Sequence, residues 1–119
     1  MSDLSSVAVK PIITFDDFAK LDLRAGAVLE ASAPDWSKKL IRYVVDFGEE
    51  IGKRVMFSGI RQWYTPEEII GKQFTFVLNL APKKMGEEES QGMMIMADDG
   101  EKPVLIPLNP SIRNGSIIR

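Results

Sequence analysis

The sequence predicts an all-β fold, a small closed barrel of five strands, on the pattern of its apolar residues. Apolar and polar residues alternate over 21–33 and 39–47, as they do in strands that bury one face. Shorter runs rich in Phe, Val and Met follow at 73–80 and 93–97 and are typical of buried strands. With 119 residues, 45% of them hydrophobic, the chain is expected to form one domain.

The first part of the chain is expected to be an arm followed by a short helix. Residues 1–12 show no apolar period and are predicted to be a flexible arm, which leaves 13–119 as the folded domain. A helix is predicted at about 14–20, because Thr14 can cap it and two aspartates lie in its first turn. The side chains that this helix is expected to bury are Phe15 and Phe18.

Glycines and a second helix signal organise the middle of the chain. Gly26 lies within the first predicted strand and indicates a bulge or a sharp bend, which a small closed barrel needs. Gly48 begins a turn into a third strand at 51–57. A short helix is predicted at about 65–70, because a Thr-Pro pair precedes two glutamates and a glycine ends it. A helix between the third and fourth strands is typical of the five-stranded Greek-key barrel called the OB-fold.

The last part of the chain is expected to close the barrel and then to extend beyond it. A polar turn at 98–103 precedes a brief strand at 104–107, and the remaining residues form a C-terminal extension. This extension carries Ile117 and Ile118, and apolar residues at such a place need a surface that buries them. Together with the irregular arm they predict a homodimer.

The composition excludes most catalytic and metal sites. The sequence contains no cysteine and no histidine, so it has no thiolate nucleophile, no imidazole base and no Cys/His zinc site. We therefore expect neither an enzyme nor a metal or other cofactor. The formal net charge is −2, so a polyanion would have to meet a local basic patch and not the whole surface.

The protein is expected to be cytoplasmic. No apolar run approaches the roughly 18 residues that a membrane-spanning helix needs. The first residues also lack the charged start and apolar centre of a secretory signal.

The stretch 79–97 carries polar residues between two apolar runs and is either a solvated turn or a binding site. Its lysines can supply counter-charge for phosphates. Ser90 and Gln91 can contact a ligand, or they can hold the loop through hydrogen bonds to the backbone. Aromatic residues elsewhere in the chain can stack on bases, and these are Trp36, Trp63 and Tyr64. Trp63 and Tyr64 can instead cover the end of the barrel.

Several blocks of the sequence, in one order, resemble the tRNA-binding domain family. The blocks are DFAKLDLRAGAVLEA (17–31), SKKLIRYVVDFG (37–48), SGIRQWYTPEEIIGKQ (58–73), and NLAPKKM with SQGMM (79–85 and 90–94). The family includes free-standing tRNA-binding proteins, the C-terminal domain of methionyl-tRNA synthetase, endothelial-monocyte-activating-polypeptide-like domains and the CsaA export chaperones.

The resemblance implies an OB-fold homodimer that binds tRNA by shape and backbone, without catalysis, as an accessory related to methionyl-tRNA synthetase. An aminoacyl-tRNA synthetase is then a further expected partner. The residues expected to contact RNA are Lys38, Lys39, Arg42, Arg61, Asn79, Lys83, Lys84, Ser90, Gln91 and Met93.

The resemblance also leaves a second function open, that of a CsaA-like export chaperone dimer that binds unfolded peptide. The stretch 45–52 is similar to the CsaA branch, and flexible Met side chains suit a peptide groove. In addition, Glu87–Glu89 place three acids beside the expected anion site, where the family usually has a glycine and apolar residues.

Overall fold

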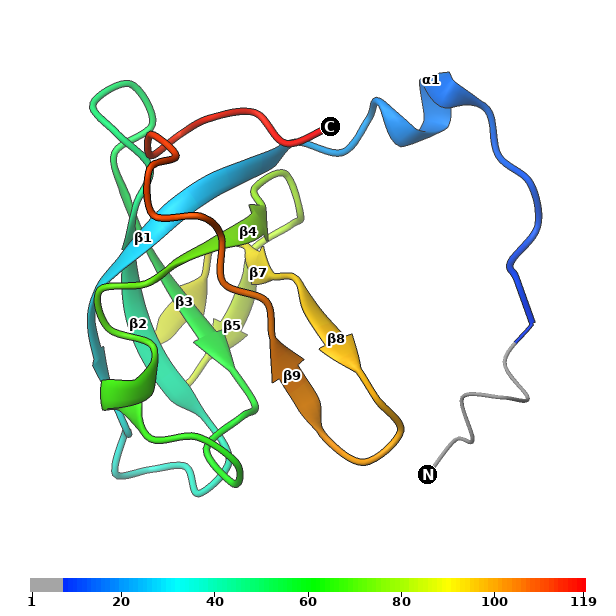
Figure 1. The fold of residues 1–119 in the computed structure, drawn as a ribbon. Coiled ribbons are helices and arrows are strands. Elements are labelled where there is room, and N and C mark those ends of the chain that lie inside the picture. Colours follow the sequence, from blue (N-terminus) through cyan, green and yellow to red (C-terminus); the bar gives the residue numbers. More distant parts are fainter. Residues whose placement is uncertain (1–7) are drawn as a thin grey trace.

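A computed structural model describes residues 8–119, and residues 1–7 of the predicted flexible arm lie outside this range. Residues 8–22 project from the barrel and carry the short helix α1 (Phe15–Phe18) (Figure 1). Thr14 caps this helix, because its side chain accepts a hydrogen bond from the Asp17 amide and Asp17 binds the Thr14 amide in return. The expectation that the helix buries its phenylalanines is wrong: Phe15 is 76% exposed and Phe18 is 37% exposed.

The predicted all-β, OB-type barrel is confirmed. Five antiparallel strands form a nearly closed barrel in the spatial order β3-β2-β1-β4-β7 (Figure 1). The strands are β1 (Leu23–Ser32), β2 (Ile41–Asp46), β3 (Lys53–Ser58), β4 (Gln73–Val77) and β7 (Met93–Met94).

Gly26 serves packing and not a bulge. It pairs regularly with Phe74 of β4, whereas the register between β1 and β2 shifts at Leu29. A Cβ atom at Gly26 would lie 2.6 Å from both the Phe47 ring and the Val45 side chain. The predicted bulge therefore lies at a different residue, and glycine is needed here because the core packs directly on the β1 backbone.

Aromatic residues dominate the core. The Phe47 and Phe76 rings meet edge to face with centroids 5.3 Å apart. Tyr43 is also fully buried, and its hydroxyl shares a hydrogen bond of 2.7 Å with Ser58 Oγ, so the buried polar group has a partner. The largest fully buried side chains are Tyr43, Phe47, Phe74, Phe76, Ile41 and Met56.

The second predicted helix is a single 3-10 turn, η2 (Pro66–Glu68), which follows β3 as the OB-type fold requires. The turn brings Ile69 into the core, where this side chain is fully buried. The Thr65 side chain does not cap the turn, although proline begins it as expected. Among the helices of residues 8–119, none has the length and apolar character needed to cross a membrane.

Two small hairpins lie outside the five-stranded sheet. β5 (Lys83–Met85) pairs with β6 (Glu88–Ser90), and β8 (Met96–Asp98) pairs with β9 (Pro103–Leu105). The predicted fifth strand is therefore divided between β7 and β8, and the stretch expected as a loop contains a hairpin. The C-terminal segment returns to the start of β1, where Ile117 forms a bridge with Arg24.

Candidate functional site

Four lysines expected to contact RNA lie in two exposed segments. Lys38 and Lys39 belong to the loop 33–40 between β1 and β2, and Lys83 and Lys84 lie on β5. All four are exposed, and none forms an ion pair within the described part of the chain. Their charges are therefore available to an anionic ligand.

Trp36 holds these two segments beside each other. Its ring packs on Phe57 of β3, with centroids 5.9 Å apart. It also meets the turn of the β5–β6 hairpin, where a Cβ atom at Gly86 would lie 2.9 Å from the ring. Gly86 also has φ +63°, so both the turn and the close approach favour glycine. The loop 33–40 and the lysine-bearing hairpin thus share one part of the surface.

Arg61 shapes the lysine loop from the protein surface. Its guanidinium donates hydrogen bonds to the carbonyl oxygens of Pro34, at 3.3 Å, and of Ser37. The Ser37 hydroxyl in turn accepts hydrogen bonds from the backbone amides of Lys39 and Leu40, both at 3.2 Å. Arg61, expected to contact RNA, is engaged in fixing the backbone that carries the lysines.

Arg42 is paired with an acid of the neighbouring hairpin. Its Nε and Nη2 atoms donate to the two carboxylate oxygens of Glu88 at 2.7 and 2.9 Å. This hydrogen bonding lowers the pKa of the Glu88 carboxyl and raises the pKa of the Arg42 guanidinium. The pair is consequently ionised at neutral pH and occupies one edge of the guanidinium.

Ser90 and Gln91 close the barrel along the free edge of β3. Gln91 acts as a strand residue, since its amide donates to the Val55 carbonyl and its side-chain Oε1 accepts from the Val55 amide, both at 2.9 Å. Ser90 is buried, and its hydroxyl oxygen accepts from the Phe57 amide at 3.0 Å. Both side chains thus satisfy backbone groups of β3 that no strand within residues 8–119 pairs.

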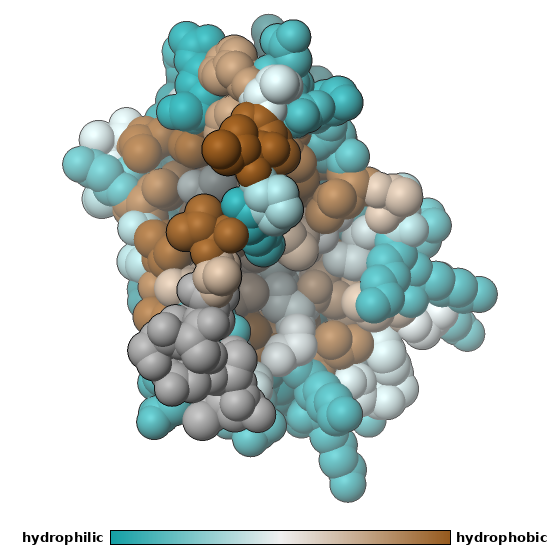
Figure 2. All heavy atoms as spheres, turned by 90° about the vertical axis from the view of Figure 1, so that its right-hand side faces the viewer, coloured by the Kyte–Doolittle hydropathy of each residue, from teal (hydrophilic) through white to brown (hydrophobic). Residues whose placement is uncertain are grey.

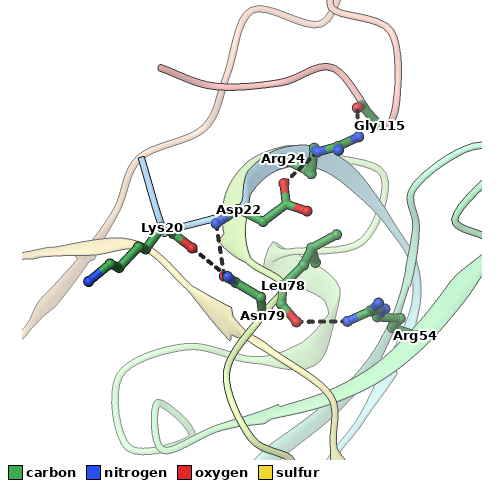
Figure 3. A network of polar contacts seen from close by, with 7 residues as sticks. All are labelled: Lys20, Asp22, Arg24, Arg54, Leu78, Asn79 and Gly115. Atoms are coloured by element: carbon green, nitrogen blue, oxygen red, sulfur yellow. Dashed lines mark hydrogen bonds and ion pairs between the residues drawn. The ribbon is translucent and has the colours of Figure 1, made fainter. Parts of the chain in front are cut away.

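Asn79 joins the barrel to the projecting arm (Figure 3). Its Oδ1 accepts from the Asp22 amide at 2.8 Å, and its Nδ2 donates to the Lys20 carbonyl at 2.6 Å. Asp22 continues the network by accepting from Arg24 Nε at 2.6 Å. Asn79 therefore fixes the point where the arm enters β1.

Arg54 belongs to the same framework but was not among the expected site residues. It donates to the carbonyls of Leu78, at 2.9 Å, and Gln91, at 3.2 Å, and so ties the exit of β4 to the barrel closure. Figure 3 shows it reaching the Leu78 carbonyl beside Asn79. The sequence contains one signal for it, because Arg54 lies two residues before the core residue Met56 on β3 and so shares the inward-facing parity.

The remaining candidate residues differ in their solvent exposure. Met93 on β7 is 48% exposed and Trp63 is 39% exposed, so both present apolar surface to solvent. Tyr64 is engaged instead, because its hydroxyl donates to the Pro103 carbonyl at 2.8 Å. Within residues 8–119, acidic side chains nowhere gather in a group of three that could hold a metal ion.

The chain matches a family model described as "Putative tRNA binding domain" over residues 23–117. It is 46% identical over 115 residues to methionine-tRNA ligase of Methanosarcina mazei, covering 95% of this chain and 16% of the ligase. It is 44% identical over 117 residues to the ligase of Xanthomonas campestris pv. campestris, covering 97% of this chain and 17% of the ligase. The chain thus spans about one sixth of the length of these two relatives.

Two crystal structures resemble the whole barrel. A MetRS related protein from Pyrococcus horikoshii superimposes with a TM-score of 0.87 and 38% identity, covering 92% of this chain and 100% of that one. The chaperone CsaA from Bacillus anthracis gives a TM-score of 0.82 and 32% identity, covering 92% of this chain and 100% of that one.

Proposed function

The chain belongs to the tRNA-binding domain family, and we propose that it binds tRNA by shape and backbone, without catalysis. The observation that carries the proposal is the surface formed by the loop 33–40 and the β5–β6 hairpin, here called the lysine surface. Its four lysines are exposed and free of ion pairs with the described residues, while the polar residues around them are used to hold the backbone.

Phosphate contacts are the interaction that such a surface can make. Lysine ammonium groups act as point charges for phosphate oxygens, and neutralising a phosphate releases condensed counterions. The net charge of −2 argues against general attraction to polyanions, so binding depends on this local group of lysines. Trp63, partly exposed, is available to stack on an unpaired base.

We also propose that the protein works with methionyl-tRNA synthetase and in the cytoplasm, where tRNA is charged. Support comes from the ligases of Methanosarcina mazei and Xanthomonas campestris, of which this chain resembles one part. A domain of this kind would add tRNA affinity to an enzyme that performs the catalysis. Co-sedimentation of the purified chain with methionyl-tRNA synthetase, with and without tRNA, tests this association.

A homodimer is the proposed assembly, because the arm leaves apolar side chains uncovered. Ile12 is 100% exposed, Ile13 is 62% exposed and Phe15 is 76% exposed. Figure 2 views the side of the molecule from which the arm projects and shows hydrophobic residues gathered there. A second copy can bury these residues in a two-fold interface.

Light scattering at micromolar concentration measures the assembly directly. The wild type should have the mass of two chains, and the Phe15→Ser, Phe18→Ser double variant should have the mass of one. A wild type with the mass of one chain would remove the dimer from the proposal while leaving tRNA binding intact.

Peptide binding is the second candidate function, favoured by the likeness to the chaperone CsaA. Exposed apolar groups such as Met93 suit capture of an unfolded segment. The two functions differ in their response to salt, because phosphate contacts weaken steeply with ionic strength and apolar contacts do not.

Paired binding assays with tRNA and with an unfolded peptide decide between the two functions. Lys83→Glu with Lys84→Glu should weaken tRNA binding about a hundredfold at low salt and leave peptide binding unchanged. Lys72→Glu with Lys102→Glu is the matched control, because it changes the same charge at exposed residues outside the lysine surface. Equal losses of tRNA affinity in both double variants would contradict binding through the lysine surface. Retention of peptide alone by the wild type would contradict tRNA binding.

A further inference from the structure

Glu88 occupies the part of Arg42 that a phosphate would bind, and we infer that this carboxylate lowers the affinity of the lysine surface for RNA. The inference rests on the proposed tRNA binding and adds to it a residue that sets its strength.

The geometry of the pair is that of an arginine bound to an oxyanion. Both oxygens of Glu88 meet two nitrogens on one edge of the guanidinium, at 2.7 and 2.9 Å. A phosphate presents two oxygens to arginine in the same forked arrangement. Glu88 is thus an internal substitute for phosphate, and RNA can engage this edge of Arg42 only by displacing it.

The pair is accessible to such an exchange. The Arg42 side chain is 29% exposed and the Glu88 side chain is 45% exposed, so solvent and ligands reach both. Ion pairs with this degree of exposure contribute little to stability because water and salt screen them. An incoming phosphate can therefore compete with the Glu88 carboxylate for the Arg42 guanidinium.

The hairpin does not depend on the ion pair for its position. At the turn, Gly86 packs against the Trp36 ring. At the other end, Ser90 accepts the Phe57 amide from β3. These two contacts flank Glu88, so its removal should release Arg42 while the lysines of β5 stay in place. This arrangement favours a role of Glu88 as a competitor of phosphate for Arg42 over a structural role in positioning the hairpin.

Glutamine substitutions test the inference by tRNA filter binding at about 50 mM salt. Glu88→Gln should tighten binding about tenfold, against about threefold for Glu87→Gln, because only the first also frees an arginine for phosphate. The slope of log K against log salt should steepen by about 0.7 to 0.9, as expected for one added phosphate contact. Glu87 is a matched control: it is exposed, adjacent in the hairpin and outside the ion pairs described for residues 8–119.

A double-variant cycle with Arg42→Gln separates occupancy from charge. In that background Glu88→Gln should tighten binding only as much as Glu87→Gln does. If Glu88→Gln unfolds, Glu88→Asp serves instead, because it keeps the charge but is too short for the fork, and it should still tighten binding.

Three outcomes overturn the inference. Equal effects of the Glu87 and Glu88 substitutions in both backgrounds would assign the gain to charge alone. Weaker tRNA binding by Glu88→Gln would show that the Arg42–Glu88 pair positions the hairpin for binding. Both results leave tRNA binding standing, whereas failure of the wild type to retain tRNA at low salt would remove the proposed function and this inference with it.

Discussion

The lysines of β5 and the amide and hydroxyl side chains next to them belong to the same sequence blocks but have different surroundings. Lys83 and Lys84 lie in solvent, outside any ion pair with residues 8–119. Asn79, Ser90 and Gln91 are instead engaged with backbone groups of other segments. The difference indicates that these blocks stabilise the barrel with their amide and hydroxyl groups and leave their lysine charges exposed to solvent.

Ser90→Ala should have the largest effect on the free energy of unfolding and a small effect on tRNA affinity. The variant leaves the buried Phe57 amide without its acceptor, which costs about 1–3 kcal/mol of the free energy of unfolding. Chemical denaturation measures the loss, with Ser32→Ala at the exposed end of β1 as the control. A stable Ser90→Ala protein that loses tRNA affinity would move Ser90 into the ligand-contacting group.

Tyr43→Phe tests the most deeply buried polar contact and should cost about 1–2 kcal/mol, because Ser58 Oγ loses its partner. Burial raises the pKa of the Tyr43 phenol above its ordinary value of 10.0. The unfolded chain ionises this phenol first, so wild-type stability should fall as the pH rises above about 10. The variant should lose less stability over that interval, as measured by denaturation at pH 9 and above. Parallel pH profiles would contradict this role of Tyr43.

Asn79→Ala should have the smallest effect on global stability, below about 1 kcal/mol, because its partners lie at the exposed base of the arm. Its effect should be local. Hydrogen exchange of the Asp22 amide should accelerate about tenfold, since this amide loses its acceptor. Asn109→Ala, which removes only a local turn contact, is the control. An unchanged exchange rate at Asp22 would show that the arm is held by other contacts.

Much of the fold followed from alternation of apolar residues, because burying one face of a strand imposes that period. The β5–β6 hairpin did not, since its strands are short and most of their residues are exposed, which leaves no apolar period to read. The predicted burial of Phe15 and Phe18 is wrong for a related reason: an apolar pair in a helix predicts burial but does not identify a surface that covers it.

The sequence blocks that form the candidate site could be predicted. Which of their side chains are exposed and which bind backbone groups could not. The lysine charges can be read directly from the residue types in the sequence. The direction of a side chain such as Ser90 or Gln91 depends on a strand edge, β3, that lies far away in the chain. The Arg42–Glu88 pair likewise joins β2 to a hairpin that the sequence did not predict.

The salt dependence of tRNA binding by the wild-type protein tests the central claim most directly. If the four lysines of the lysine surface each neutralise one phosphate, the slope of log K against log salt should be about −3. Measurements at several salt concentrations, from about 50 to 200 mM, give this slope. A slope near zero, or no retention of tRNA at the lowest salt, would contradict binding through the lysine surface.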